Sequence, residues 1–130
     1  MAKELTNGEL LGLAMGLQAI YTLALEPKEM LAVRALYRVV MPAAGDAEEA
    51  AKGIARRHST KRPDGKEIVP AGTPAFDAFM RETREFNELA AVVELPEATI
   101  SYSALLEAMG GRMSAQLMDQ LEPVLDGIPG

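Results

Sequence analysis

Seven basic or titratable side chains lie within fifteen residues near the middle of the chain. They are Lys52, Arg56, Arg57, His58, Lys61, Arg62 and Lys66. Guanidinium and ammonium groups at this density can hold phosphate or carboxylate groups through charged hydrogen bonds. The cluster therefore predicts a site for a small anionic, nucleotide-like ligand. The alternative is structural, because cations at the end of a helix also complement the helix dipole and a solvated loop accommodates them.

Nucleic acid is not the partner that we expect for this cluster. The whole chain has a formal net charge of −6, which repels a phosphate backbone. No recognition-helix pattern and no aromatic stacking platform accompanies the basic residues. A small anion requires only one local patch of positive charge, so it fits the cluster better.

The only histidine, His58, has too few partners in the sequence for catalysis or metal binding. A nucleophilic mechanism would need a hydroxyl and an orienting acid around it, and Ser59 and Thr60 are only its neighbours along the chain. A metal site would need several converging ligands, and Asp64 with one histidine does not supply them. The chain has no cysteine. We therefore predict a surface position for His58 and no metal site.

Several glutamates could be read as paired carboxylates for general acid–base chemistry. Glu82, Glu85 and Glu88 recur at steps of three, which places them on one helix face, with arginines between them. This pattern is typical of a solvated face, and Glu94 and Glu97 lie beyond that helix. Phosphate-binding glycine loops of the GxxxxGK[ST] and GxGxxG types are absent. We predict no enzymatic activity and no cofactor.

The helices that would position these residues have recognisable starts. Thr6 and Glu9 fit a capping box, which predicts a first helix from this point to the Glu26-Pro27 break. A second helix begins at Pro27, and we expect Pro42 to kink or break it near residues 41–45. A second capping-box pattern at residues 46–49 would restart the helix, which would fray at residues 58–60.

Further turn and cap signals divide the second half of the chain. Residues 62–65 form an Arg-Pro-Asp-Gly turn, followed by a candidate short strand at residues 66–69. Thr73 before Pro74 predicts the start of a third helix with an apolar face. Short extended segments are expected at residues 92–95 and 98–102. A short helix is stopped by glycines at 110 and 111, and Ser114 caps a last helix.

The first helix is apolar on more than one face. A stripe of large side chains follows its helical period, namely Leu10, Leu13, Ala14, Leu17, Ile20 and Tyr21. Gly8, Gly12 and Gly16 recur every four residues on a different face, which would permit the close approach of another helix. We expect this first helix to be central in the fold or to pack against a second subunit.

Composition and charge limit the class of protein. The chain has 130 residues, of which 48% are hydrophobic and 25% charged, which predicts one soluble globular domain over residues 1–130. No run approaches the roughly 20 apolar residues of a membrane span. Residues 1–7 do not resemble a secretion signal, so we expect a cytoplasmic protein. Formal charge is −3 over residues 1–51, +5 over 52–66 and −8 over 67–130.

The order of several short motifs resembles a family of small phage and prophage proteins without established activity. The resemblance is carried by the N-terminal residues 5–11, the long helix after Pro27, the turn at 64–66, and the segments 86–89, 93–95 and 114–125. The interruption at Pro42 and Gly45 departs from the unbroken second helix of that family. The resemblance implies a phage context, with the host cytoplasm as location, and no catalytic residues.

The sequence therefore predicts a mainly helical α+β domain with four or five helices and one or two short strand pairs. A basic loop at about residues 52–66 would separate the second and third helical regions. The predicted function is a non-enzymatic binding protein that sequesters or inhibits a host factor, through a host or phage protein contact or an anionic ligand. The alternative is a virion assembly or tail-associated protein. In either role we expect a homo-oligomer that contacts no membrane.

Overall fold

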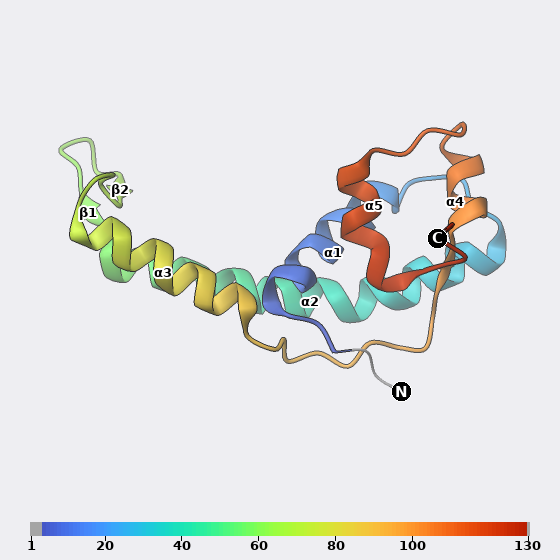
Figure 1. Cartoon of the computed structure of the whole chain (residues 1–130), viewed down its shortest axis with the longest axis horizontal. Helices are drawn as coiled ribbons and strands as arrows, with labels where there is room; N and C mark the ends of the chain where they lie inside the picture. Colours follow the sequence, from blue (N-terminus) through green and yellow to red (C-terminus); the bar gives the residue numbers. More distant parts are fainter. Residues whose placement is uncertain (1–3, 130) are drawn as a thin grey trace.

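Helices dominate the computed structural model, which describes residues 4–129 (Figure 1). The helices in this part of the chain are α1 (Asn7–Ile20), α2 (Pro27–His58), α3 (Pro74–Glu88), α4 (Tyr102–Ala108) and α5 (Ala115–Leu121), followed by one 3₁₀ turn (Glu122–Val124). The strands are β1 (Thr60–Lys61), β2 (Glu67–Ile68), β3 (Ile100–Ser101) and β4 (Leu125–Asp126). β1 pairs antiparallel with β2, and β3 pairs parallel with β4. The predicted α+β, mainly helical class is confirmed.

Helix α1 begins where the capping box predicts and lies at the centre of the fold. The Glu9 amide donates to Thr6 Oγ1 at 3.1 Å, and the Thr6 amide donates to Glu9 Oε1 at 3.0 Å. Leu13, Leu17 and Ile20 are fully buried. Helices α2, α3 and α5 of the same chain pack against α1. Of the two predicted settings for this apolar helix, the central one is confirmed.

The glycines of α1 allow its own chain to approach closely. A Cβ atom built on Gly16 would lie 2.9 Å from Leu121 Cδ2, closer than real side chains come. A Cβ atom on Gly8 would lie 3.3 Å from the carbonyl oxygen of Asn87, at the end of α3. Helices α5 and α3 therefore occupy the glycine face, so these glycines serve packing within the chain.

Helix α2 continues through Pro42 without interruption, so of the kink or break predicted near residues 41–45, the break is wrong. Proline inside a helix removes one backbone hydrogen bond and costs about 3 kcal/mol. Burial on both sides of the proline offsets this cost, because Val40 is fully buried and Ala44 is only 2% exposed. No second helix start occurs at residues 46–49. Tertiary packing overrides the local signal here.

The C-terminal segment closes the body of the molecule. Ser114 caps α5 as predicted, with its hydroxyl accepting the Leu117 amide at 3.1 Å. Gly110 and Gly111 end α4 with positive φ angles of 72° and 80°. The extended segment predicted at residues 92–95 forms no strand. Its first residue, Val92, is 97% exposed, and no neighbouring strand lies beside it to supply backbone hydrogen bonds.

No helix within residues 4–129 is long and apolar enough to cross a membrane. Residues 1–3, which belong to the N-terminal segment where we expect no secretion signal, lie outside the described residues.

Candidate functional site

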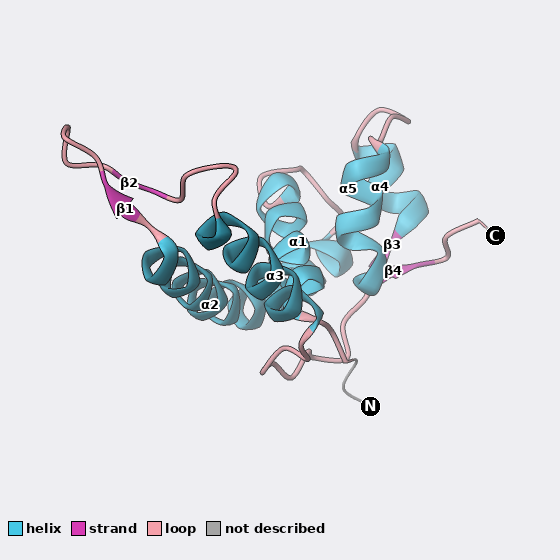
Figure 2. Ribbon diagram, turned by 60° about the vertical axis from the view of Figure 1, so that its left-hand side comes forward, coloured by secondary structure: helices cyan, strands magenta, loops and turns pink. Residues whose placement is uncertain are grey.

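Two helices and a hairpin form an arm that projects from the rest of the molecule (Figure 1). We define the arm as residues 46–88, its distal part as residues 52–81, and its base as residues 46–51 with 82–88. The C-terminal half of α2 and the length of α3 lie side by side, and the β1–β2 hairpin connects them at the far end (Figure 2). The predicted basic residues all belong to this distal part.

The seven residues of the predicted anion site do not share one cradle. Lys52, Arg56, Arg57 and His58 lie in the last two turns of α2, so the first half of the predicted basic loop is helix. Lys61, Arg62 and Lys66 lie on the β1–β2 hairpin. Their side-chain contacts divide them into three separate groups.

The first group lines an open groove between the end of α2 and β2. The groove has a volume of about 340 Å³ and is lined by Lys52, Ala55, Arg56, Ser59, Glu67, Ile68 and Val69. Both of its cations approach one carboxylate outside the groove. Lys52 Nζ lies 3.3 Å from Glu49 Oε1, and Arg56 Nη2 lies 4.0 Å from Glu49 Oε2. These contacts neutralise part of the positive charge that a small anion would need.

The second group fastens α2 to α3. Glu82 Oε2 lies 2.8 Å from His58 Nε2 and 3.1 Å from Arg57 Nη2. The hydrogen bond from His58 and the nearby Arg57 and Arg81 charges lower the pKa of the Glu82 carboxyl, against an opposing effect of burial. The His58 side chain is 19% exposed and so partly buried, which is less exposure than the predicted surface position implies. The spacing of the glutamates predicts Glu82 on a solvated helix face, whereas in the structure it contacts His58 and Arg57.

The pairing of His58 with Glu82 cannot be recognised from the sequence. His58 and Glu82 are 24 residues apart, and no local pattern joins them. The Ser59 hydroxyl is not directed to the imidazole, because it donates to the Arg56 carbonyl oxygen at 3.1 Å. The contacts of Glu82 with His58 and Arg57 join α2 to α3.

The third group lies at the tip of the hairpin. Gly65 has a φ of +87°, and its amide donates to the Arg62 carbonyl oxygen at 2.9 Å, which confirms the predicted turn. Arg62 Nη2 lies 3.6 Å from Asp64 Oδ2. Lys61 and Lys66 are exposed and form no ion pair with any described residue. The tip therefore presents two free ammonium groups.

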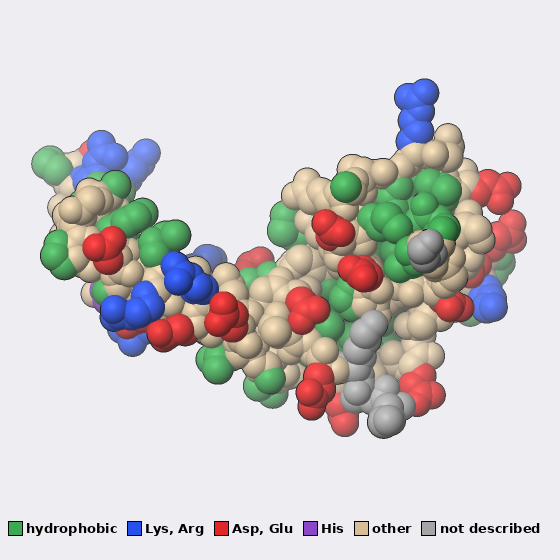
Figure 3. Space-filling view, viewed as in Figure 1, with side chains coloured by type: hydrophobic (Ala, Val, Ile, Leu, Met, Phe, Trp, Pro, Cys, Tyr) green, Lys and Arg blue, Asp and Glu red, His purple; other side chains and the backbone are tan. Residues whose placement is uncertain are grey.

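Charge is distributed unevenly between the arm and the rest of the chain. The distal part has seven lysines and arginines against three aspartates and glutamates, a formal charge of +4. The remaining residues, 1–51 and 82–130, have a formal charge of −10. Blue side chains gather at the end of the arm, and red ones are spread over the base and the body (Figure 3).

Helix α3 has an apolar face that its own chain covers incompletely. Phe76, Phe79 and Phe86 lie on one face of α3 and are partly buried, but no residue of α3 is fully buried. The rings of Phe76 and Phe79 lie 6.4 Å apart, and Met80 beside them is 45% exposed. In the distal part, α2 is the only helix of the described residues that packs against α3, because the body does not extend this far (Figure 1).

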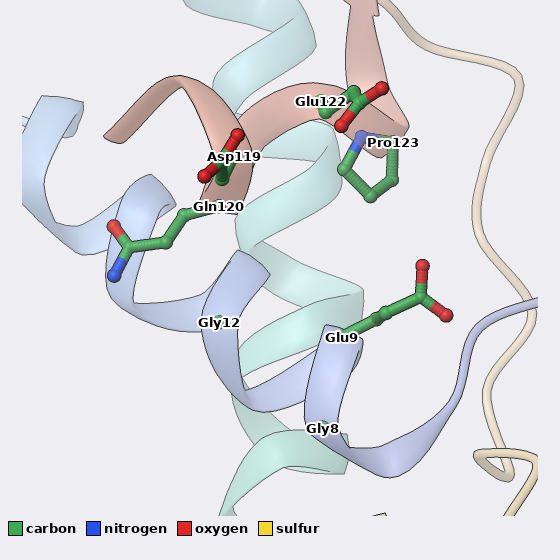
Figure 4. A pocket seen from close by; sticks show the side chains of 7 residues that line it. All are labelled: Gly8, Glu9, Gly12, Asp119, Gln120, Glu122 and Pro123. Carbon is green, nitrogen blue, oxygen red and sulfur yellow. The ribbon is translucent and has the colours of Figure 1, made fainter. Parts of the chain in front are cut away.

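A second groove, between α1 and α5, has an acidic rim. It has a volume of about 490 Å³, its floor includes Gly8 and Gly12, and Glu9, Asp119 and Glu122 stand around it (Figure 4). Glu9 Oε1 is already engaged in the capping box of α1. Within residues 4–129, no three histidine or acidic side chains are grouped so that they could hold a metal ion.

Comparison with known proteins identifies no relative. No protein-family model, no curated protein and no solved structure matches the chain. The resemblance to small phage proteins therefore stays a prediction, and the function must be argued from the arm itself.

Proposed function

We propose that the chain is a non-enzymatic binding protein whose distal arm contacts an acidic, partly apolar surface of a partner protein. The observation that supports this proposal is the +4 charge on the distal part of the arm, in a chain that is otherwise acidic. Opposite charges on two proteins steer their association and favour the correct partner. The half-buried phenylalanines of α3 add apolar surface beside the positive charge. In a phage context, such binding would sequester or inhibit a host factor.

The division of the basic cluster supports a protein surface over a mononucleotide. A phosphate group is held best by several donors that converge on it. Here Lys52 and Arg56 share Glu49, while Arg57 is directed to Glu82 on the other helix. An extended protein surface could contact the groove, the tip and the apolar side of α3 at once.

A virion-assembly role would use exposed apolar surface of the first helix for subunit contacts, and most of the apolar stripe of α1 is buried within its own chain. Exposed apolar side chains remain on the arm, such as Met80, and outside it, such as Leu31 and Val92.

A peptide titration tests the proposed function. The probe is a fluorescein-labelled peptide of alternating glutamate and leucine, compared with a matched lysine and leucine peptide, in fluorescence anisotropy. We expect the acidic peptide to bind and the basic one not to bind. The variant Lys61→Ala with Lys66→Ala should weaken binding about 3- to 10-fold, since each exposed charge pair contributes about 0.2–1 kcal/mol. Binding should also weaken as salt is added.

The control for this titration removes two cations outside the arm. Lys28→Ala with Arg112→Ala changes the net charge equally, and both residues are exposed. This control should leave the affinity for the acidic peptide unchanged. Equal weakening by both double variants, or no binding of the acidic peptide, would refute the proposal. Mononucleotides in the same assay test the small-ligand hypothesis, with a Tm rise that Arg56→Ala with Arg57→Ala abolishes as its expected sign.

A further inference from the structure

We infer that the acidic surface is the arm base of a second copy of this chain, and that two arms pair side by side in opposite directions. This inference rests on the proposed function, and it adds the identity and the orientation of the partner. Three features of the arm support it: the change of charge along its length, the location of its free charges, and its incompletely covered apolar side.

Charge changes sign along the arm. The base contains six aspartates and glutamates against one arginine, a formal charge of −5, and the distal part has a charge of +4. Two arms in opposite directions bring each positive distal part against the negative base of the other. Two arms in the same direction bring like charges together, and their repulsion disfavours that arrangement. The charge pattern therefore selects the antiparallel arrangement.

The charged side chains of the arm that form no ion pair with any described residue include two lysines at the tip and two acids at the base. Lys61 and Lys66 are exposed at the tip, and Asp46 and Glu48 are exposed at the base. None of these four takes part in an ion pair among the described residues. The ion pairs within the arm instead engage Glu49, Glu82 and Asp64, the last of these in the turn of the hairpin. The outer groups of the arm remain free to form pairs between two copies.

The apolar side of the arm needs a further layer. A helical layer with one apolar face is stable when another layer covers that face. α3 has fifteen residues, hence a length of about 22 Å, and in its distal half α2 is the only helix of the described residues that packs against it. The side chains of Phe76 and Met80 remain partly exposed as a result. A second arm would cover them and complete a bundle of four helices.

A second copy fits better than an unrelated acidic protein, because one arm contains both the positive and the negative surface that the contact needs. A two-fold contact uses the same patch on both subunits, so that patch must be complementary to itself when reversed. An arm with a positive distal part, a negative base and an apolar side between them meets this condition. The contact is also closed, and it predicts a dimer and no larger assembly.

Charge reversal tests the pairing, with light scattering and sedimentation velocity as readouts at low ionic strength. We expect the unaltered chain to be a dimer. Lys61→Glu with Lys66→Glu should raise the dimer dissociation constant at least about tenfold, and so should Asp46→Lys with Glu48→Lys. The variant with all four reversals should return to the affinity of the unaltered chain. An equimolar mixture of the two double variants should form a heterodimer.

The control for the base variant reverses two exposed acids outside the arm. Glu94→Lys with Glu107→Lys changes the net charge by the same amount and should leave the dimer intact. Thermal melting of each variant confirms that it folds.

The possible outcomes separate this inference from the proposed function. A monomer that still binds the acidic peptide overturns arm pairing and leaves the proposed function in place. A monomer that does not bind the peptide overturns both. A dimer that neither reversal weakens, or that all four reversals fail to restore, overturns the antiparallel arrangement.

Discussion

The body and the arm are both built from packed helices, but their helices are covered to different extents. In the body, α1 lies between three other helices, and Leu13, Leu17 and Ile20 are completely buried. In the arm, the fifteen residues of α3 include three phenylalanines, yet none of its residues is fully buried. The number of surrounding layers, and not the number of apolar residues, decides burial. The helices of the body are therefore covered more completely than α3, whose apolar side chains stay partly exposed.

The largest contrast is expected from truncating one apolar side chain in each region. Leu17→Ala should destabilise the chain by about 2–5 kcal/mol, because the residue is fully buried and leaves a cavity. Phe76→Ala removes a larger side chain from a half-buried position, and we expect a loss below about 1.5 kcal/mol in the monomer. Urea unfolding followed by circular dichroism measures both. A greater loss at Phe76 would show that the arm has a core of its own.

Replacement of one glycine by alanine in each region should change stability in opposite directions. Gly16→Ala places a methyl group 2.9 Å from Leu121 Cδ2 and 3.1 Å from Gln120 Cβ, so overpacking should cost about 1–3 kcal/mol. Gly53→Ala, in the arm, meets nothing within 4 Å, and the higher helix propensity of alanine should stabilise the chain by up to about 1 kcal/mol. Thermal melting should show Tm falling for the first variant and rising for the second. A rise at Gly16 would contradict the close approach of α5.

The smallest effect concerns the contact that joins the two arm helices. The pKa of Glu82 is below its ordinary value because His58 donates a hydrogen bond to the carboxylate and Arg57 lies nearby. A lowered carboxyl pKa stabilises the folded state above the ordinary pKa of about 4.3, and this contribution is lost as the pH falls through the lowered value. Glu82→Gln should therefore be less stable than the unaltered chain at neutral pH.

Unfolding midpoints measured across a pH series check this expectation. The difference between the unaltered chain and Glu82→Gln should shrink as the solution is acidified below the ordinary carboxyl range. Glu85 is the matched control position, because it is exposed, lies on the same helix and forms no ion pair with any described residue. Glu85→Gln should show no such difference. A constant difference at all pH values would assign the effect of Glu82 to packing and not to its charge.

Features governed by near neighbours were predictable from the sequence. The caps at Thr6, Thr73 and Ser114 each depend on a hydrogen bond that spans three residues, and all three are present. The turn before Lys66 depends on one proline and one glycine. The signal at Pro42 is also local, but the break that it allows does not occur, because burial of α2 on both sides of the proline outweighs one missing hydrogen bond.

The candidate site was predictable only in part. The charge pattern along the chain indicates that residues 52–66 differ from their surroundings, and the structure places them at the end of an arm. Which of these side chains remain free was not predictable. Glu82 engages Arg57 and His58 from another helix, and Lys61 and Lys66 are left without a partner among the described residues.

The helical class, the caps, the turn and the concentration of positive charge follow from composition or from residues a few positions apart. The continuity of α2, the approach of α5 and α3 to the glycines of α1, and the incomplete cover of α3 arise only on folding. These features depend on contacts between segments distant in the chain, whose free energy no local pattern contains. The arm is the product of both: local sequence makes its helices, and the limited extent of the body leaves their distal surface exposed.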